Sequence, residues 1–409
     1  MAKIITDPEK IAEVLTRGVE NIFPDKESLS RVLQSGRRLK LYCGFDPSAP
    51  SLHIGNAIQI NKLAQFQALG HEVIFLIGDF TGMIGDPTDK QAARKKLTRE
   101  QVVANSRNYH KQASAYLDFT GENPAKILYN SAWSDLLTFR DLIELTANFT
   151  VQQMIQRDMF QARLKEEKPI YMHEFLYPVA QGYDSVAMDV DLEVGGNDQM
   201  FNMLCGRDLI RILKKKEKFV MTNKLLIDPS GKKMGKSEGN IIKLDETPEN
   251  MYGQVMAWPD GLIAPAFEMA TKVPLSELRE INKQLAAGVN PRDLKMRLAR
   301  EFVSLNYGAD AARSAEENFI KVIQKKEAPD RLKEIFWPEE KAKIAAVLVK
   351  SGLVASGAEA KRLIAQGAVK LDDQVVNDSQ AIIDIPPAGC LIKKGKFGFI
   401  RLHCRPDGR

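Results

Sequence analysis

An apolar strand, a helix and a second apolar strand follow one another near the start of this chain. Residues 39–45 and 73–77 form short apolar runs that predict strands, and residues 54–69 show helical spacing with Gly70 as the expected stop. Strands joined by a helical crossover pair in parallel, so we predict an α/β class domain with a doubly wound, Rossmann-like parallel sheet. Such sheets bind ligands beyond the carboxyl ends of their strands.

The segments on either side of this unit extend the domain. Residues 9–33 are predicted to be amphipathic helix with a break at Pro24. Residues 136–163 have a helical pattern and are predicted to be an insertion, because the next strand-like run comes only after them. The elements expected after the insertion are a strand at 186–194, a helix at 199–215 and a strand at 219–227.

The pattern becomes helical from Thr247 onward. Thr247-Pro248 and Asn290-Pro291 are typical of helix starts, and Gly288 and Gly308 are the expected stops. A charged stretch with two prolines predicts a linker, and a small α+β module follows it. The domains expected are a catalytic domain at 1–245 with an insertion around 120–185, an all-helical domain at 246–325, a linker at 326–342 and a small domain at 343–409.

Composition excludes several classes of protein. No apolar run approaches the roughly 20 residues that span a bilayer, so a cytoplasmic protein with no membrane contact is expected. The four cysteines have no CxxC spacing and indicate neither a disulfide framework nor a zinc site. Residues 341–409 carry a net charge of +6, whereas residues 1–340 carry −1. This basic tail predicts either a polyanion-binding module or a solvated surface, and charge alone leaves both open.

Two segments suit a phosphate ligand. His53, Gly55 and Asn56 open the helix after the first strand, where a helix N-terminus offers unpaired N–H groups. By itself, a structural histidine at that helix start is the simpler interpretation. Lys233 and Lys236 belong to the glycine-punctuated loop KKMGKS, and such lysines could close over a triphosphate or simply be solvated. The two segments together, in this order, are far more specific than either alone.

These two segments resemble the HIGH and KMSKS motifs of the class I aminoacyl-tRNA synthetases. The chain differs at Asn56, which replaces the second histidine, and at Gly235, which replaces the first serine. An asparagine can still donate a hydrogen bond, and both lysines remain. The resemblance implies that His53, Lys233 and Lys236 act on the phosphates of ATP as pyrophosphate leaves.

A third segment, YPVAQGYD, carries polar side chains at helical spacing. Tyr177, Gln181 and Asp184 would share one helix face, as either a pocket wall or an ordinary wet surface. Together with LYCGFDP, GDFTGMIGDP and GGNDQ, this segment resembles the tyrosyl-tRNA synthetase family over residues 41–240. The resemblance implies a tyrosine–tRNA ligase that forms tyrosyl-adenylate from L-tyrosine and ATP, and then charges the 3′ end of tRNA(Tyr).

The same resemblance implies the roles of individual residues. Tyr42 and Asp184 would bind the phenol of tyrosine, and Asp86, Tyr177 and Gln181 its α-ammonium group. Gln199 would lie near the carboxylate. The residues implied to bind ATP are Cys43, Gly44, Asp46, His53, Asn56, Gly196, Asp198, Lys233 and Lys236. Mg²⁺ is expected as the companion of ATP, with no metal held tightly by the protein, since no His/Asp cluster has metal-ligand spacing.

The tail and the insertion imply partners. Residues 344–402 resemble the small S4 RNA-binding domain, with Asp372-Asp373 where Asn-Gly is more usual and with Lys361 and Arg362 as RNA-binding residues. The family resemblance implies a homodimer joined through the insertion, around residues 149–157. Two alternatives remain open: an enzyme like tryptophanyl-tRNA synthetase, or an RNA-binding relative that has lost catalysis.

Overall fold

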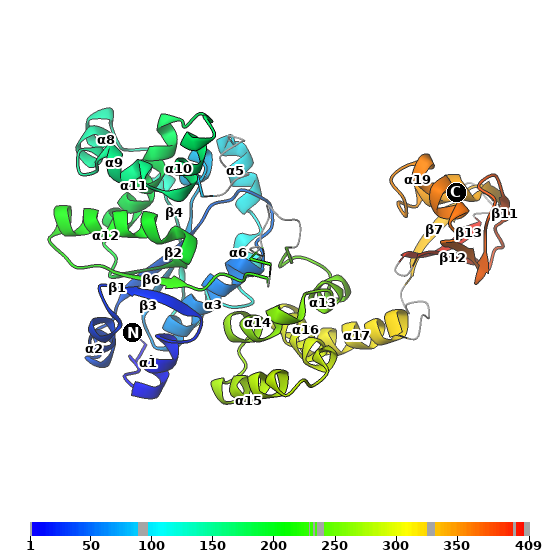
Figure 1. The fold of residues 1–409 in the computed structure, drawn as a ribbon, viewed down its shortest axis with the longest axis horizontal. Helices are drawn as coiled ribbons and strands as arrows, with labels where there is room; N and C mark the ends of the chain where they lie inside the picture. Colours follow the sequence, from blue (N-terminus) through cyan, green and yellow to red (C-terminus); the bar gives the residue numbers. More distant parts are fainter. Residues whose placement is uncertain are drawn as a thin grey trace. The chain divides into compact units, whose positions relative to one another are not determined.

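The computed structural model describes residues 2–88, 97–228, 230–231, 234, 241–324, 332–395 and 398–404. The chain divides into two compact units, Met1–Ala312 and Arg313–Arg409. Figure 1 colours the first unit from blue to yellow and the second toward red. Among the described residues, no helix combines the length and apolar character that a membrane span requires.

The first unit is built on a six-stranded sheet with the strand order β1-β6-β5-β2-β3-β4. The predicted β-α-β unit is confirmed: β2 (Lys40–Phe45) and β3 (Glu72–Ile77) pair in parallel, and α3 (Ile54–Ala68) joins them. Gly70 follows that helix with a φ of 89°, a left-handed conformation that favours glycine. The remaining parallel strands are β4 (Lys126–Tyr129), β5 (Leu192–Gly196) and β6 (Phe219–Asn223).

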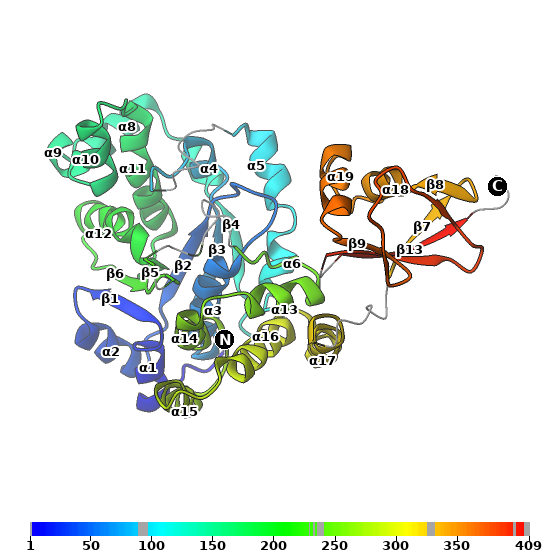
Figure 2. The ribbon, with the colours of Figure 1, turned by 45° about the vertical axis from the view of Figure 1, so that its right-hand side comes forward.

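Helices cover both faces of this sheet. The helices α11 (Met172–Met188) and α12 (Met200–Lys214) pack against each other on one face, and α3 covers the other (Figure 2). Shorter helices follow β3 and β4 and border the carboxyl end of the sheet. They are α4 (Thr81–Ile84), α5 (Arg99–Ser106), α6 (Tyr109–Ala113) and α7 (Ser131–Ser134).

The prediction of helix over residues 9–33 is wrong for the middle of this range. The chain instead forms α1 (Pro8–Val14), the strand β1 (Val19–Phe23) and α2 (Lys26–Gln34). Gly18, with a φ of 66°, turns the chain between α1 and β1. The apolar spacing of this segment fits a helix, but its backbone pairs antiparallel with β6, so sheet pairing overrides the local pattern.

The expected strand boundaries later in the domain also need correction. Residues 186–188 end the helix α11, and Asp189 follows with a φ of 49° as its left-handed cap. The strand β5 therefore begins only at Leu192. The strand expected at 219–227 ends at Asn223. The short strand β4 lies inside the range 120–185 that was expected to be helical insertion, and its four residues were too few to give a clear pattern.

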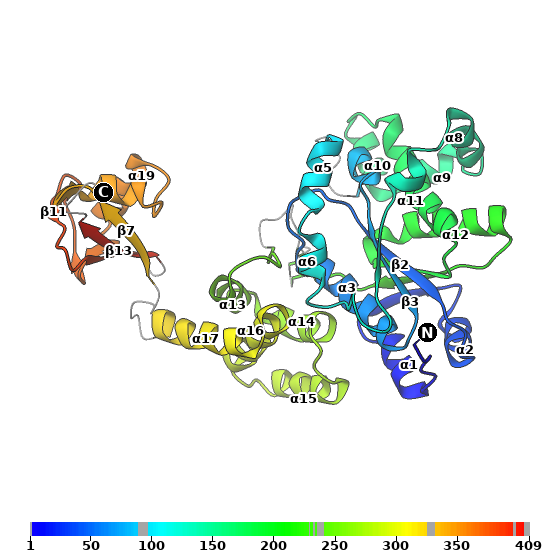
Figure 3. The same ribbon diagram turned by 180° about the vertical axis from the view of Figure 1, so that it is seen from behind.

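The predicted helical insertion consists of three short helices. They are α8 (Phe139–Thr146), α9 (Val151–Ile155) and α10 (Asp158–Lys165), and they lie together beside α11 (Figure 3). Thr138 and Thr150 cap α8 and α9 through their side chains. Leu145 and Met154 pack into the same apolar cluster as Tyr42, which ties the insertion to the sheet.

Two helix starts and two helix ends after Thr247 lie where the sequence predicted them. Thr247 Oγ1 accepts a hydrogen bond of 3.3 Å from Asn250 N, and Asn290 Oδ1 accepts one of 3.0 Å from Arg292 N. Gly288 and Gly308 follow helix ends with φ angles of 74° and 89°. The helical elements are α13 (Pro248–Met256), a 3₁₀ turn (Asp260–Leu262), α14 (Ile263–Ala270), α15 (Leu275–Ala286), α16 (Pro291–Tyr307), α17 (Ala309–Phe319) and a π-helical turn (Ile320–Gln324).

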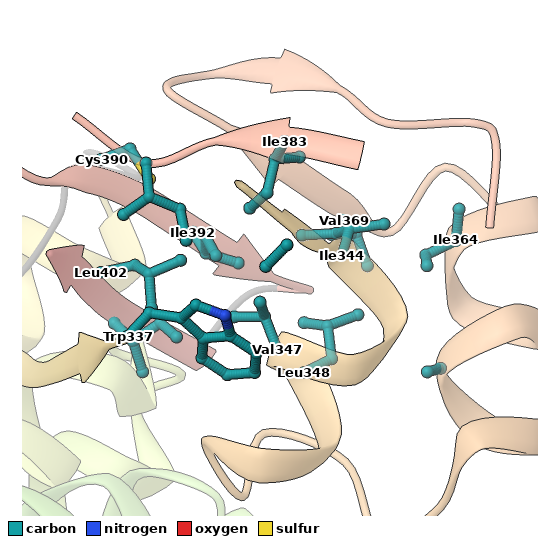
Figure 4. Packing of buried hydrophobic residues seen from close by; sticks show 14 of the residues in the cluster. Trp337, Ile344, Val347, Leu348, Ile364, Val369, Ile383, Cys390, Ile392 and Leu402 are labelled. Atoms are coloured by element: carbon teal, nitrogen blue, oxygen red, sulfur yellow. The ribbon is translucent and has the colours of Figure 1, made fainter. Parts of the chain in front are cut away.

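The second unit is a small α+β module. Its five-stranded sheet has the order β10-β9-β12-β13-β7, and β8 pairs with β11. Apolar side chains of the sheet and of α18 (Ile344–Lys350) and α19 (Gly357–Ala365) form its core, including Trp337, Ile364 and Leu402 (Figure 4). The strands are β7 (Lys333–Trp337), β8 (Lys341–Lys343), β9 (Val369–Leu371), β10 (Gln374–Val375), β11 (Ile382–Asp384), β12 (Cys390–Lys394) and β13 (Gly398–Cys404).

Two details of this unit bear on the sequence analysis. The range 326–342, which was expected to be a linker, contains β7 and the start of β8. Asp372 and Asp373 join β9 to β10 with φ angles of 44° and 67°. Aspartate tolerates this left-handed conformation better than most residues, which explains how the pair can stand where Asn-Gly is more usual.

Candidate active site

A cavity of about 1000 Å³ lies in the first unit, lined by the carboxyl ends of the central strands. It collects thirteen of the residues that sequence analysis selected: Tyr42, Cys43, Gly44, Asp46, His53, Asn56, Asp86, Tyr177, Gln181, Asp184, Gly196, Asp198 and Gln199. Lys233 and Lys236 lie outside the described residues. Lys361 and Arg362 lie on α19 of the second unit, where both are exposed.

His53 and Asn56 form the N-terminal cap of α3. His53 Nδ1 accepts a hydrogen bond of 3.1 Å from Gly55 N, and Asn56 Oδ1 accepts one of 3.0 Å from His53 N. In neutral imidazole the proton then lies on Nε2, which makes that atom a donor. The Asn56 amide keeps its Nδ2 group as a donor while its oxygen closes the cap. The asparagine therefore fits this position for a local structural reason.

Tyr42 and Asp184 line the cavity from β2 and α11. The Tyr42 hydroxyl lies 2.9 Å from Ser185 Oγ, and Asp184 accepts hydrogen bonds of 2.8 Å from Trp133 Nε1 and 3.2 Å from Asn130 Nδ2. Burial raises the pKa of the Tyr42 phenol and of the Asp184 carboxyl well above their ordinary values, although the two donors oppose the rise at Asp184. The pair offers a hydroxyl and a carboxyl group to a polar ligand in a buried part of the cavity.

Asp86 lies in the loop after α4 and is held by its neighbours. It accepts hydrogen bonds of 2.9 Å from Thr88 N and 2.6 Å from Gln199 Nε2, and a further short one from Thr88 Oγ1. Gln199 Oε1 in turn accepts from Asn202 Nδ2 at 2.9 Å. Burial raises the pKa of Asp86, and the hydrogen bonds from Thr88 and Gln199 counter it. Asp86, which is predicted to bind the α-ammonium group, and Gln199, which is predicted to lie near the carboxylate, are thus in direct contact.

Tyr177 links α11 to the loop that follows β2. Its hydroxyl donates a hydrogen bond of 2.8 Å to Asp46 Oδ2, and Thr81 Oγ1 donates one of 2.6 Å to Asp46 Oδ1. A Cβ on Gly78 would lie 2.0 Å from Asp46 Oδ1, so only glycine leaves room for this carboxylate. The Asp46 side chain therefore braces the loop whose backbone lines the cavity.

Gly196 and Asp198 form the other rim of the cavity, after β5. A Cβ on Gly196 would lie 2.5 Å from Asp198 Oδ1, so a larger residue there would require the Asp198 side chain to move. Cys43 lies within β2 on the cavity wall, and burial raises the pKa of its thiol above the ordinary value. The thiol therefore stays protonated and can donate a weak hydrogen bond.

The sequence analysis missed several residues of this site. Trp133 and Asn130 follow β4, a strand that the sequence did not reveal, so no pattern drew attention to their position. Glu193 lies in the cavity wall and Lys218 lies behind it, and both are buried. Glu193 could have been singled out, because it is an acidic residue within the otherwise apolar run LEVGG. Lys218 could not, because it is the last residue of a lysine-rich stretch.

Comparisons with known proteins show which family the chain resembles. Residues 34–324 match the family model described as tRNA synthetases class I (W and Y), and residues 343–385 match the S4 domain. The tyrosine–tRNA ligase of Moorella thermoacetica is 43% identical over 395 residues, which cover 95% of both chains. That of Thermotoga maritima is 40% identical over 397 residues, 97% of this chain and 98% of its own.

A solved structure supports the fold. The C-terminally truncated mitochondrial tyrosyl-tRNA synthetase of Aspergillus nidulans superposes with a TM-score of 0.64. The superposition covers 75% of this chain and 92% of the other, at 23% sequence identity.

Proposed function

Because the chain belongs to the tyrosine–tRNA ligases among the class I tRNA synthetases, we propose how the residues of its cavity divide the reaction. The enzyme activates L-tyrosine with ATP, which releases pyrophosphate, and transfers the tyrosyl group to tRNA. The observation that carries the assignment is the single cavity lined by thirteen residues predicted for tyrosine and ATP. The carboxylate of tyrosine would attack the α-phosphate in line, so positioning and charge stabilisation suffice without a protein nucleophile.

The phenol of tyrosine would meet Tyr42 and Asp184. Both side chains are almost fully buried, and Trp133 and Asn130 hold the Asp184 carboxyl in place. When phenylalanine enters, these polar groups lose their ligand partner in a dry site, and that loss disfavours it. Tryptophan has no hydroxyl to satisfy the pair, which is why we assign tyrosine within the family.

The backbone of tyrosine would meet the other polar groups of α11 and the neighbouring loops. The α-ammonium group would be bound by Asp86, Tyr177 and Gln181, and the carboxylate would lie near Gln199. The 2.6 Å hydrogen bond from Gln199 to Asp86 supports this arrangement. It holds the side chain predicted to lie near the carboxylate next to one that is predicted to bind the ammonium group.

ATP would lie along the N-terminus of α3 and the rim after β5. His53 Nε2 would donate to the phosphates, with Asn56 beside it, since the capping of His53 Nδ1 leaves the proton on Nε2. Asp198 would bind the ribose hydroxyls with Cys43 and Gly196 alongside, and the backbone at Gly44 and Asp46 would face the α-phosphate. Lys233 and Lys236 would neutralise the departing pyrophosphate.

Mg²⁺ would arrive with ATP. Within the described part of the chain, no group of three or more His, Cys, Asp or Glu side chains is arranged to hold a metal ion. On the triphosphate, the ion would offset phosphate charge.

The tRNA would be bound by the helical region and the second unit. We assign anticodon binding to the helical domain at 246–325, and contact with the tRNA backbone to the domain at 343–409. The exposed Lys361 and Arg362 on α19 support the latter, because charged side chains on one short helix suit phosphate contacts. The cytoplasmic location expected from the sequence stays a prediction.

The insertion would join two copies of the chain into a homodimer. Large apolar side chains are exposed on and beside its helices, and Leu136 and Phe139 are each 78% exposed. Such a concentration of exposed apolar surface usually marks an interface. Further exposed apolar side chains on or next to these helices are Ile143, Val151, Leu164, Tyr171 and Met172.

Tyrosine-dependent pyrophosphate exchange tests the proposed function. The purified enzyme should incorporate labelled pyrophosphate into ATP with tyrosine and Mg²⁺, and should do so far more slowly with tryptophan or phenylalanine. Exchange that responds to tryptophan instead would refute the substrate assignment, and binding of tRNA without any exchange would indicate an inactive relative.

A further inference from the structure

A buried ion pair lies behind the phenol end of the cavity. Lys218 on the turn before β6 is fully buried, and Glu193 on β5 is 2% exposed. The Lys218 ammonium donates to Glu193 Oε2 in a short contact, to Ser185 Oγ at 2.7 Å and to Met203 O at 3.3 Å. These three acceptors use all three of its N–H groups, so the ammonium has a fixed orientation.

Glu193 fixes the orientation of the Gln181 side chain. Its second carboxylate oxygen, Oε1, accepts a hydrogen bond of 3.0 Å from Gln181 Nε2. Because the NH₂ end of the amide is held by Glu193, its oxygen end is left for the cavity that Gln181 lines. An amide oxygen there can accept from an ammonium group, whereas the opposite orientation would repel one.

Ser185 links the ion pair to Tyr42 through hydrogen bonds. Ser185 Oγ accepts from Lys218, so its own proton is free to point elsewhere. Ser185 Oγ donates this proton to Glu193 Oε2 at 3.3 Å, where the charge of the carboxylate strengthens the bond, and it lies 2.9 Å from the Tyr42 hydroxyl. The Tyr42 hydroxyl then donates to Ser185 Oγ and turns its lone pairs toward the cavity that Tyr42 lines.

We propose that Lys218 and Glu193 are positioning residues that fix the hydrogen-bond direction of Tyr42 and the amide orientation of Gln181. The inference rests on the proposed function, because it assigns the pair a part in selecting tyrosine over phenylalanine. Tyr42 and Asp184 then meet the oxygen and the proton of the substrate phenol. A phenyl ring offers neither group.

The energetics of buried ion pairs agree with this role. Desolvation of two charges offsets most of their attraction, so such a pair adds little stability over packed apolar side chains. Lys218 and Glu193 instead fix the directions of hydrogen bonds, since Glu193 contacts Lys218, Ser185 and Gln181. Lys218 also lies 5.9 Å from the ring centre of Tyr42.

The test is the double variant Lys218→Met/Glu193→Gln, which removes both charges and leaves neither buried alone. We expect the ratio of kcat/KM for tyrosine to that for phenylalanine in pyrophosphate exchange to fall roughly tenfold, which corresponds to one hydrogen bond. The KM for ATP should stay unchanged, because the pair lies away from His53 and Asp198. Ser185→Ala, which keeps the ion pair and breaks its link to Tyr42, should lower the same ratio.

Lys62→Met is the matched control. Lys62 is also buried, but its ammonium donates to Val14 O and Arg17 O at 2.8 Å and to Gln65 Oε1 at 2.7 Å, away from the cavity. This variant should lower the melting temperature and leave the tyrosine-to-phenylalanine ratio unchanged.

The outcomes separate the two hypotheses. An unchanged ratio in Ser185→Ala and in the double variant would overturn the positioning role, even where exchange by the wild type upholds the function. If the double variant does not fold, the ratio in Ser185→Ala decides alone. Absence of tyrosine-dependent exchange in the wild type would reject the proposed function itself.

Discussion

The indole nitrogen of Trp133 donates a hydrogen bond of 2.8 Å to Oδ1 of Asp184. The two residues come from α7 and α11, so a short helix after the edge strand β4 holds a carboxyl group that faces the substrate cavity. Asp184 was visible in the sequence through its helical spacing, whereas Trp133 was not. The contact shows that the phenol end of the cavity depends on residues from two separate segments of the chain.

Asp184→Ala should reduce the preference for tyrosine over phenylalanine. The substitution removes the buried acceptor for the phenol proton, and a hydrogen bond to such a group contributes roughly 1.5–3 kcal/mol. We expect a loss of about tenfold to a hundredfold in the ratio of kcat/KM values, measured by pyrophosphate exchange. Trp133→Phe should produce a smaller loss in the same direction. Unaltered selectivity in both variants would mean that the phenol is recognised elsewhere.

Lys236→Ala should slow adenylate formation without weakening the binding of tyrosine. The lysine is proposed to stabilise charge on pyrophosphate in the transition state, so its removal should lower the rate constant by about 10²-fold or more. Rapid-quench measurement of adenylate with saturating substrates reports this step, and equilibrium dialysis reports tyrosine binding. A wild-type rate would remove this lysine from the mechanism.

Lys361→Ala/Arg362→Ala should weaken tRNA charging and leave amino-acid activation intact. Each phosphate contact that is lost lowers the slope of log affinity against log salt by about 0.7–0.9. We therefore expect a several-fold rise in the KM for tRNA and a shallower salt dependence, with pyrophosphate exchange unchanged. Lys350→Ala, on the neighbouring helix α18, provides a comparison in which one positive charge is lost from another helix of the same unit. Equal charging by the double variant and the wild type would count against α19 as the contact.

Phe139→Glu/Val151→Glu should convert a dimer into a monomer. Both side chains are exposed apolar groups of the insertion, at 78% and 68%, and burying two carboxylates against apolar surface is strongly unfavourable. Sedimentation velocity measures the change in mass. Phe336→Glu, at an exposed apolar site of the second unit, is the control that should leave the mass unchanged. A wild type that sediments as a monomer would contradict the proposed interface.

Lys62 should make the stability of the enzyme depend on pH above neutrality. Burial, and next the charge of Arg17, lower its pKa from 10.5 to about 7. Between these values the unfolded state binds more protons than the folded state, so the free energy of unfolding should rise with pH. Relative to Lys62→Met, the wild type should gain about 1 kcal/mol per pH unit from pH 7.5 to 9 in urea unfolding. Parallel pH profiles of the two proteins would show that Lys62 stays charged.

The sequence predicted the parts of the fold that local patterns encode. The β2-α3-β3 unit, the caps at Thr247 and Asn290 and the polar face of α11 all follow from spacing or capping residues. The strand β1 was mistaken for helix because its apolar positions fit both periods, and only pairing with β6 decides between them. The end of α11 was missed because the apolar residues Val186 and Met188 fit the pattern of a helix and that of a buried strand equally well.

The candidate site was predictable where its residues belong to recognisable segments. His53, Tyr42 and the α11 residues lie in such segments, and the cavity brings them together. Glu193 and Lys218 could not be paired from the sequence, because they lie on neighbouring strands or turns whose register only the folded sheet determines. Their proposed effect on Tyr42 also requires Ser185, a residue with no distinctive pattern.

Val19 in β1 lies opposite Asn223 in β6. The first strand of the chain therefore forms an edge of the six-stranded sheet beside β6, the last of its strands in sequence. At about 5–20 residues per second, synthesis would separate these two strands by roughly 10–40 s. Throughout that interval β1 has no partner strand, and its apolar residues remain open to chaperones or to other chains. The nascent enzyme therefore carries an unfinished sheet edge until most of its first unit has been made.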